Sequence, residues 1–347
     1  MKLLLLPFSL LYGIGVGFRN FLFDIGILKS KRFQVPIICI GNITVGGTGK
    51  TPHTELLIET LKEKFRVACL SRGYKRKTSG FRLATPESTA ADIGDEPLQI
   101  HRKFPDILVA CDAKRVRGIE KLSMLPTPPQ VILLDDAFQH RYVQADKNIV
   151  LIDYNRPVTE DHLLPWGRLR ESCHALKRAD YIIVTKCPPN LSPIDQRIWS
   201  KHLKIKPYQR LFFSMTGYGE IHSLVPGSPI PQPSPACGIL CLTGIAQPAA
   251  YAEHLKTYSS HITELHYPDH HNFNNKDIQH ITQVFQAIPQ EEKYIFTTEK
   301  DAVRLEACSL PEEIRERLFY IPVVPKFIRE QNVFLNEISE YVRKNQK

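Results

Sequence analysis

The sequence from residue 41 to residue 52 reads Gly41-Asn42-Ile43-Thr44-Val45-Gly46-Gly47-Thr48-Gly49-Lys50-Thr51-Pro52. A short apolar run at 35–40 predicts a buried strand before it, and the apolar periodicity at 53–64 predicts a helix after it. Glycines let a loop curl until several backbone N–H groups point at one anion, and a helix N-terminus adds its positive dipole there. Strand, glycine loop, Gly-Lys-Thr and helix together predict a phosphate-binding P-loop.

One position departs from the strict P-loop pattern, which has glycine where this chain has Thr44. The doublet Gly46-Gly47 still leaves the loop flexible. A glycine-rich turn without a ligand is the alternative interpretation. Lys50 and Thr51 favour the phosphate loop, because a lysine can contact phosphates and the hydroxyl after it can ligate Mg²⁺.

Composition limits the classes of protein that fit. With 347 residues, 43% of them hydrophobic, the chain is long enough for two domains with ordinary cores. Its net charge of +9 indicates an anionic partner, which can be a nucleotide, a nucleic acid, a phosphorylated substrate or an acidic lipid surface. The eight cysteines include no Cys-x-x-Cys pair, which favours reduced thiols in the cytosol.

The N-terminal segment is apolar and is followed by basic residues. Residues 3–18 carry no charge, and a cluster of Lys29, Lys31 and Arg32 closes the segment. A signal peptide is disfavoured because no small-x-small cleavage site follows, and the run is short of the roughly 20 apolar residues that span a bilayer. We expect a helix lying in the membrane interface; a buried core helix is the alternative.

Apolar runs alternate with helical patterns through the first two hundred residues, which predicts a doubly wound, mainly parallel sheet. Near residue 205 the pattern changes to an expected strand pair, 210–215 with 220–225, and then to five prolines within 226–235. A second, smaller α/β unit follows. We therefore predict an α/β, P-loop NTPase-like fold with an N-terminal membrane-associated helix at 1–34, a P-loop domain at 35–209, a strand pair and linker at 210–236, and a C-terminal domain at 237–347.

Two pairs of adjacent acids are candidates for the chemistry of the site. Asp135 and Asp136 end the apolar run 131–134, so they should lie at the carboxyl edge of the sheet, where ligands bind and where a P-loop site needs an acid for Mg²⁺. Asp95 and Glu96 follow Gly94 and could orient a hydroxyl, accept its proton and neutralise charge through a metal. The alternatives are an ordinary strand-ending turn and a solvated helix start.

Two further motifs are less specific. The segment 71–80 is basic and bounded by glycines, so it could close over phosphates or contact anionic lipid, or it could be a solvated charged run. The histidines of segment 266–271 invite a zinc site, but Pro268 breaks the helical spacing of His266 and His270. A histidine that works with a carboxylate fits this segment better.

Taken together, these motifs resemble the lipid A 4′-kinase (tetraacyldisaccharide 4′-kinase) family over nearly the whole chain. Besides 41–52, the resemblance rests on Leu-Ser-Arg-Gly-Tyr at 70–74, Gly-Asp-Glu-Pro at 94–97, Asp-Asp-Ala-Phe-Gln-His at 135–140, Leu-Leu-Pro-Trp-Gly-Arg-Leu-Arg-Glu at 163–171, Thr-Gly-Ile-Ala at 243–246, Asp-His-His-Asn-Phe at 269–273 and Thr-Glu-Lys-Asp-Ala-Val-Arg-Leu at 298–305. The family usually has Gly, Ala and Pro where this chain has Ala137, Trp166 and Arg168.

The resemblance implies transfer of the ATP γ-phosphoryl group to the 4′-hydroxyl of an acylated glucosamine disaccharide 1-phosphate at the cytosolic face of the bacterial inner membrane. It implies Asp95 as the base with His270 as its partner and, less directly, anion contacts from Arg72 and Arg117. A closure of the two domains around ATP would bring His270 to the site. The implied ATP and Mg²⁺ ligands are Thr44, Val45, Gly46, Gly47, Thr48, Gly49, Lys50 and Thr51 for ATP, and Thr51, Glu96, Asp135 and Asp136 for Mg²⁺.

Two other classes of function are alternatives to the kinase. A membrane-associated P-loop ATPase or switch would hydrolyse ATP without a lipid acceptor and would tolerate loss of Asp95. A nucleic-acid motor would use the positive charge, but we find no further helicase-like motif and expect no nucleic-acid partner. We expect the protein to act as a monomer on the membrane surface.

Overall fold

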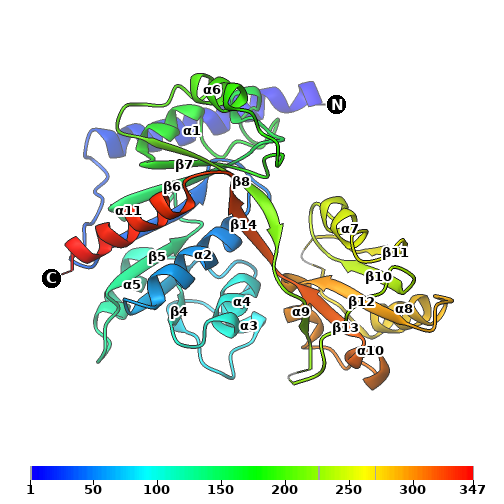
Figure 1. The fold of residues 1–347 in the computed structure, drawn as a ribbon. Helices are drawn as coiled ribbons and strands as arrows, with labels where there is room; N and C mark the ends of the chain where they lie inside the picture. Colours follow the sequence, from blue (N-terminus) through cyan, green and yellow to red (C-terminus); the bar gives the residue numbers. More distant parts are fainter. Residues whose placement is uncertain (1, 226, 270, 347) are drawn as a thin grey trace. The chain divides into compact units, whose positions relative to one another are not determined.

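The computed structural model describes residues 2–225, 227–269 and 271–346 (Figure 1). His270, the expected partner of Asp95, lies outside these residues. The chain forms two compact units, and we describe each by itself. The first unit contains Met1–Gly217 and Val324–Lys347, and the second contains Tyr218–Val323.

Within the described residues, the first unit is built on a nine-stranded sheet of order β14-β8-β7-β6-β1-β5-β2-β4-β3. Strand β1 runs parallel to β5 on one side and to β6 on the other, so the P-loop leaves the centre of the sheet. The strands are β1 (Ile37–Asn42), β2 (Val67–Ser71), β3 (Arg82–Leu83), β4 (Leu108–Cys111), β5 (Val131–Asp135), β6 (Lys147–Asp153), β7 (Tyr181–Thr185), β8 (Arg210–Tyr218) and β14 (Val323–Phe327).

Helices cover both faces of this sheet. Side chains of β1 alternate between two cores: Ile37 and Cys39 pack with α5 and α6, whereas Ile38 and Ile40 pack with α2, α4 and α11. Burial on both faces explains why the strands read as continuous apolar runs. The helices of this unit are α1 (Leu6–Asp24), α2 (Lys50–Lys62), α3 (Ala90–Ile93), α4 (Asp95–Lys103), α5 (Arg115–Ser123), α6 (Pro193–His202) and α11 (Gln331–Lys344), with short 3-10 turns at Lys2–Leu5, Val158–Glu160 and Cys173–Arg178.

The second unit carries, in the part of the chain that is described, a five-stranded sheet of order β11-β10-β12-β13-β9. Its first four strands are parallel to their neighbours, and β9 pairs antiparallel with β13. Helix α7 packs on one face, and α8, α9 and α10 pack on the other. The elements are β9 (His222–Ser223), β10 (Gly238–Thr243), α7 (Ala249–Leu255), β11 (His261–His266), α8 (Asn275–Gln286), β12 (Lys293–Thr298), α9 (Glu299–Leu305), α10 (Glu312–Glu316) and β13 (Leu318–Ile321).

The expected strand pair at 210–225 is wrong. Strand β8 pairs in parallel with β7 in the first unit, whereas β9 pairs with β13 in the second. Burial explains the outcome, because Phe212 and Phe213 of β8 are both buried in the cores of the large sheet, which an isolated hairpin could not provide. The division into units also differs from the expected C-terminal domain at 237–347, because β14 and α11 return to the first unit.

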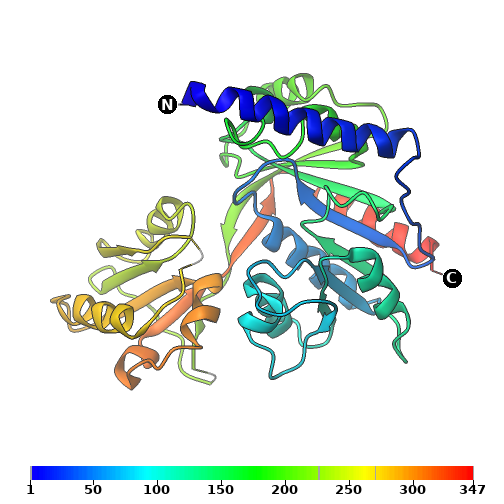
Figure 2. The same cartoon turned by 180° about the vertical axis from the view of Figure 1, so that it is seen from behind.

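Helix α1 is long and apolar but exposed. By length and composition it is the one helix among the described residues that could cross a membrane, and only 11% of its 18-residue apolar window is buried. The spacing of Phe8, Leu11, Ile14 and Phe18, each more than 60% exposed, places them on one helix face. The structure therefore contradicts the alternative of a buried core helix. In Figure 2 the helix lies along the first unit.

Candidate active site

The P-loop forms as the sequence predicts. Strand β1 ends at Asn42, and helix α2 begins at Lys50, three residues before the expected start. Gly46 has φ 107° and Gly49, the residue that caps α2, has φ 84°. Other residues rarely adopt this left-handed backbone, so both turns require glycine. Thr48 lies inside the loop, where its Oγ1 accepts a hydrogen bond of 2.9 Å from Asn42 Nδ2.

Hydrogen bonds from two neighbouring segments hold the loop in place. The Val45 N–H donates to Arg168 O at 2.8 Å, and the Arg170 N–H donates to Ile43 O at 2.8 Å. On the other side, Thr185 Oγ1 donates to Thr48 O at 3.0 Å. The start of the loop is thus paired with the 168–170 segment and its end with the carboxyl end of β7, which preorganises the N–H groups.

His53, in the first turns of α2, is a structural residue. Burial lowers the pKa of its imidazole to about 4, so the ring is neutral. Nδ1 lies 2.8 Å from Gly49 O, which can only accept, so Nδ1 carries the proton. Nε2 then accepts from Ser214 Oγ at 3.1 Å. The ring ties the last glycine of the loop to β8.

Lys50 and Asp136 face each other across the loop. Lys50 Nζ lies 3.8 Å from Asp136 Oδ1, and Arg170 Nη1 donates to both carboxylate oxygens at 2.9 and 3.1 Å. Burial alone would raise the pKa of Asp136, but Lys50 and Arg170 outweigh it and lower this pKa. Asp136 is therefore ionised, and its backbone adopts the left-handed conformation (φ 46°).

Asp135 is buried beside other acids. Its carboxylate oxygens accept long hydrogen bonds, 3.4 Å each, from Thr54 Oγ1 and Ser71 Oγ. Burial, together with the nearby charges of Glu96 and Asp136, raises the pKa of Asp135 to about 7, whereas the charges of Lys50 and Arg115 act in the opposite direction. Glu96 and Asp136 thus act on Asp135 as like charges, and a cation bound beside this carboxyl group would lower its pKa.

Replacing Asp135 with asparagine is expected to stabilise the ligand-free protein at alkaline pH. The folded-state pKa lies above the ordinary value of 3.8, so this carboxyl group contributes stability below pH 4 that is lost as the pH rises through about 7. Asparagine cannot ionise, so the variant should gain roughly 1–3 kcal/mol at pH 8 and little at pH 4. Chemical denaturation in EDTA at both values measures this difference.

Asp136→Asn is the matched control. Its pKa is lowered, so its ionised form contributes stability above the ordinary pKa that is lost at acidic pH. This variant should be less stable than the wild type at pH 8. Equal shifts of the two variants in the same direction would contradict the opposite charge environments.

Asp95 and Glu96 are the first two residues of α4, where the helix dipole favours negative charge. Two glycines make this placement possible. A Cβ on Gly94 would lie 3.0 Å from Tyr74 O, and a Cβ on Gly73 would lie 2.9 Å from Ile93 O. The close approach of these two backbone segments brings the start of α4 beside the 70–74 segment. From there the charge of Glu96 raises the pKa of Asp135.

The acids present fit a magnesium ion that is shared with phosphates. Among the residues described, no group of three or more His, Cys, Asp or Glu could hold a metal ion alone. Mg²⁺ is commonly bound through one or two carboxylates plus substrate phosphates, and it prefers hard oxygen ligands. Asp135, Asp136, Glu96 and Thr51 supply such oxygens at the end of β5, the start of α4 and the start of α2.

Sequence reasoning selected Arg117, but Arg115 is the arginine that faces the acids. Arg117 forms a two-point pair with Asp112, with distances of 2.7 and 2.8 Å. Arg115 is 2% exposed and its Nη2 approaches Asp135 O at 3.5 Å. Its charge acts on Asp135 and Asp136, so it balances their carboxylates. Arg170 was likewise missed, although it lies in the quoted 163–171 motif.

Helix α1 contacts the same loops that support the site. Ser9 Oγ donates to Leu163 O at 2.8 Å, and Tyr12 OH donates to Arg170 O at 3.0 Å. Farther along, Arg19 donates to Gln139 O at 3.2 Å. Gln139 in turn donates through Nε2 to Asn42 O at 2.7 Å, at the start of the P-loop. Helix α1 is therefore linked to the P-loop through one or two intervening residues.

Comparisons with known proteins identify the family of this chain. The family model for tetraacyldisaccharide-1-P 4′-kinase matches residues 1–343. The chain is 50% identical to the tetraacyldisaccharide 4′-kinase of Parabacteroides distasonis, over 96% of this chain and 93% of the relative. It is 43% identical to that of Flavobacterium johnsoniae, over 99% and 98%. The crystal structure of LpxK from Aquifex aeolicus in complex with ATP has a TM-score of 0.75 and 27% identity, and the match covers 100% of this chain and 99% of that one. The chain therefore belongs to the tetraacyldisaccharide 4′-kinase family.

Proposed function

We propose that this protein transfers the γ-phosphoryl group of ATP to the 4′-hydroxyl of tetraacyldisaccharide 1-phosphate, a step of lipid A biosynthesis. The observation that carries the proposal is the P-loop with Lys50, placed next to Asp135 and Asp136 in a chain of this family. Phosphoryl transfer needs positioning and charge stabilisation more than covalent chemistry. Both are built into this edge of the sheet.

In the proposed reaction, the P-loop binds ATP, and the residues around it bind Mg²⁺ and interact with the acids. The loop from Thr44 to Thr51 holds the phosphates of ATP through its N–H groups and the start of α2. Lys50 neutralises charge on the β- and γ-phosphates. Thr51, Glu96, Asp135 and Asp136 hold Mg²⁺, which when bound neutralises charge that develops on the transferred group. Arg170 holds the ionised carboxylate of Asp136, and the charge of Arg115 opposes the upward shift of the Asp135 pKa.

Asp95 is the proposed base. It lies at the first position of α4, next to Glu96, whose charge reaches Asp135. From there a carboxylate can orient the attacking hydroxyl and accept its proton. The pairing with His270 stays a prediction, because that residue lies outside the described part of the chain.

The exposed face of α1 supports binding to the membrane on which the acylated acceptor resides. An apolar helix face inserts into the headgroup boundary, and Lys29, Lys31 and Arg32 follow it in the sequence. Because α1 contacts the segments at 139 and 163–170, a lipid bound beside it lies near the P-loop. We propose the cytoplasmic face of the inner membrane as the location, since ATP is available there.

Charging this face should release the protein from membranes. The triple variant Phe8→Asp/Ile14→Asp/Phe18→Asp is expected to bind vesicles of phosphatidylethanolamine and phosphatidylglycerol at least about tenfold more weakly, because each buried apolar side chain contributes roughly 1.5–3 kcal/mol. Met124→Asp/Ile194→Asp/Ile198→Asp adds the same charge at exposed apolar residues elsewhere in the first unit. Equal loss in both variants would contradict an apolar role for α1.

The decisive experiment is the transfer of radiolabelled γ-phosphate to a purified 4′-hydroxyl disaccharide lipid in mixed micelles. The kinase yields labelled lipid in proportion to ADP released. A membrane-associated ATPase, the alternative function, yields labelled inorganic phosphate whether or not the lipid is present. Release of phosphate with no labelled lipid would overturn the kinase proposal.

A further inference from the structure

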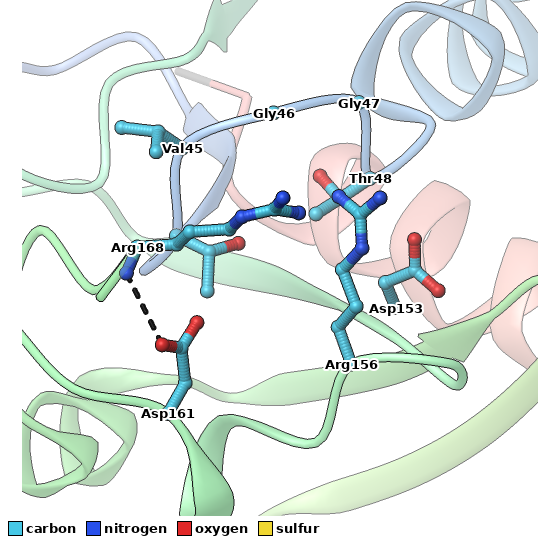
Figure 3. Close-up of a pocket in the computed structure, with 9 residues that line it drawn as sticks. Val45, Gly46, Gly47, Thr48, Asp153, Arg156, Asp161 and Arg168 are labelled. Carbon is cyan, nitrogen blue, oxygen red and sulfur yellow. Dashed lines mark hydrogen bonds between the residues drawn. The ribbon is translucent and has the colours of Figure 1, made fainter. Parts of the chain in front are cut away.

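A small pocket lies against the outer part of the P-loop, and two arginines point into it. The loop residues Gly46, Gly47 and Thr48 form one wall, and Arg156 and Arg168 belong to the segment that follows β6. Figure 3 shows both guanidinium groups directed toward the loop near Gly47 and Thr48. A Cβ placed on Gly46 would lie 3.7 Å from Arg156 Nη1, so this arginine is within reach of the loop.

The acids of the pocket are already engaged by other groups. Asp153 accepts from Lys186 Nζ at 2.8 Å and from the Asn155 N–H at 3.0 Å. Asp161 accepts through Oδ1 from the backbone N–H groups of His162 and Arg168, at 2.7 and 3.1 Å. Neither carboxylate forms an ion pair with the two arginines, and across residues 2–225, 227–269 and 271–346 the guanidinium groups of Arg156 and Arg168 have no hydrogen-bonded or ion-paired partner.

Two unpaired guanidinium groups that share one pocket repel each other, and an anion between them would remove that cost. Guanidinium matches phosphate oxygens in a planar, two-point geometry, so phosphate is the anion that this pair suits best. The backbone also fixes the position of Arg168, because its N–H is held by Asp161 and its C=O accepts from Val45. The arginine therefore moves with the first residues of the P-loop.

We propose that Arg156 and Arg168 form a second phosphate subsite beside the P-loop. The ligand is a phosphate oxyanion carried either by the nucleotide or by the 1-phosphate of the acceptor lipid. The segment that carries both arginines reaches α1 through the contact of Leu163 with Ser9, so both sources have access. The lipid source rests on the proposed function, whereas the nucleotide source requires only a P-loop that binds ATP.

The test compares the wild type with Arg156→Gln/Arg168→Gln in the full chain. Each lost charged hydrogen bond should weaken binding of the phosphate-bearing ligand by about tenfold. One arm measures the Kd of a non-hydrolysable ATP analogue by calorimetry. The other measures the KM for acceptor lipid at saturating ATP, together with the KM for the same lipid without its 1-phosphate. Arg197→Gln, an exposed arginine of α6, is the matched control.

The outcomes separate the two sources. A weaker Kd for the nucleotide alone assigns the subsite to the triphosphate. A raised KM for the phosphorylated lipid, with the KM of the dephosphorylated lipid unchanged, assigns it to the acceptor. Changes below twofold in both arms, in a variant that unfolds at the wild-type temperature, overturn the proposal. If the double variant does not fold, Arg168→Gln alone serves, because that side chain is exposed. If the wild type transfers no phosphate to lipid, the calorimetric arm still decides the subsite.

Discussion

Replacing Asp95 with asparagine is expected to lower kcat for phosphoryl transfer by about 10²–10⁴-fold while ATP still binds. Asparagine keeps the size of the side chain and its place at the start of α4 but cannot accept the proton of the attacking hydroxyl. The measurement is a single-turnover transfer of labelled phosphate to lipid, with nucleotide affinity measured separately by calorimetry. A large fall in kcat with an unchanged Kd for ATP assigns Asp95 to the chemical step.

Glu63→Gln is the control for Asp95, because this acid is exposed at the far end of α2. It should retain the wild-type rate. An Asp95→Asn variant that keeps more than about a tenth of the rate would mean that another group accepts the proton, since general-base catalysis contributes at least 10²-fold. Tolerance of Asp95→Ala with continued ATP hydrolysis would instead favour the ATPase function.

Most of the first unit could be predicted because its strands are buried on both faces. The runs at 131–134, 148–153 and 181–185 lie within strands β5, β6 and β7, and the expected P-loop lies between β1 and α2. The recruitment of β14 and α11 could not be predicted. Their pattern is that of an ordinary strand and helix, and only packing against β8 and α2 assigns them to the first unit.

The candidate site also combines residues that the sequence marks with residues that only tertiary contacts identify. The sequence marks Asp135 and Asp136 because a strand end places them, and it marks Lys50 because the loop pattern is local. It cannot choose between Arg115 and Arg117, which have the same side chain two positions apart. Burial of Arg115 against Asp135 and pairing of Arg117 with Asp112 decide their roles, and both depend on tertiary contacts.

Replacing Lys50 with alanine is expected to lower kcat/KM for ATP by roughly 10²–10³-fold or more, the effect of removing one preorganised charge from a developing phosphoryl transition state. The P-loop itself should survive, because its shape depends on Gly46, Gly49 and the bonds to Arg168 and Thr185 rather than on this side chain. Asp136 keeps Arg170 as a partner at 2.9 Å, so the fold should not be left with an unpaired buried acid.

The control for Lys50 is Lys64→Ala, which removes an exposed lysine just beyond α2. Steady-state kinetics with ATP varied at saturating lipid separate binding from chemistry. If Lys50 acts mainly in the transition state, kcat falls much more than the Kd for ATP rises. Lys50→Arg should not restore the rate, because the planar fork cannot replace a compact ammonium that lies 3.8 Å from Asp136. A Lys50→Ala variant with wild-type kcat/KM would show that the triphosphate does not lie in this loop, and the assignment of Thr51, Asp135 and Asp136 to its metal would fail with it.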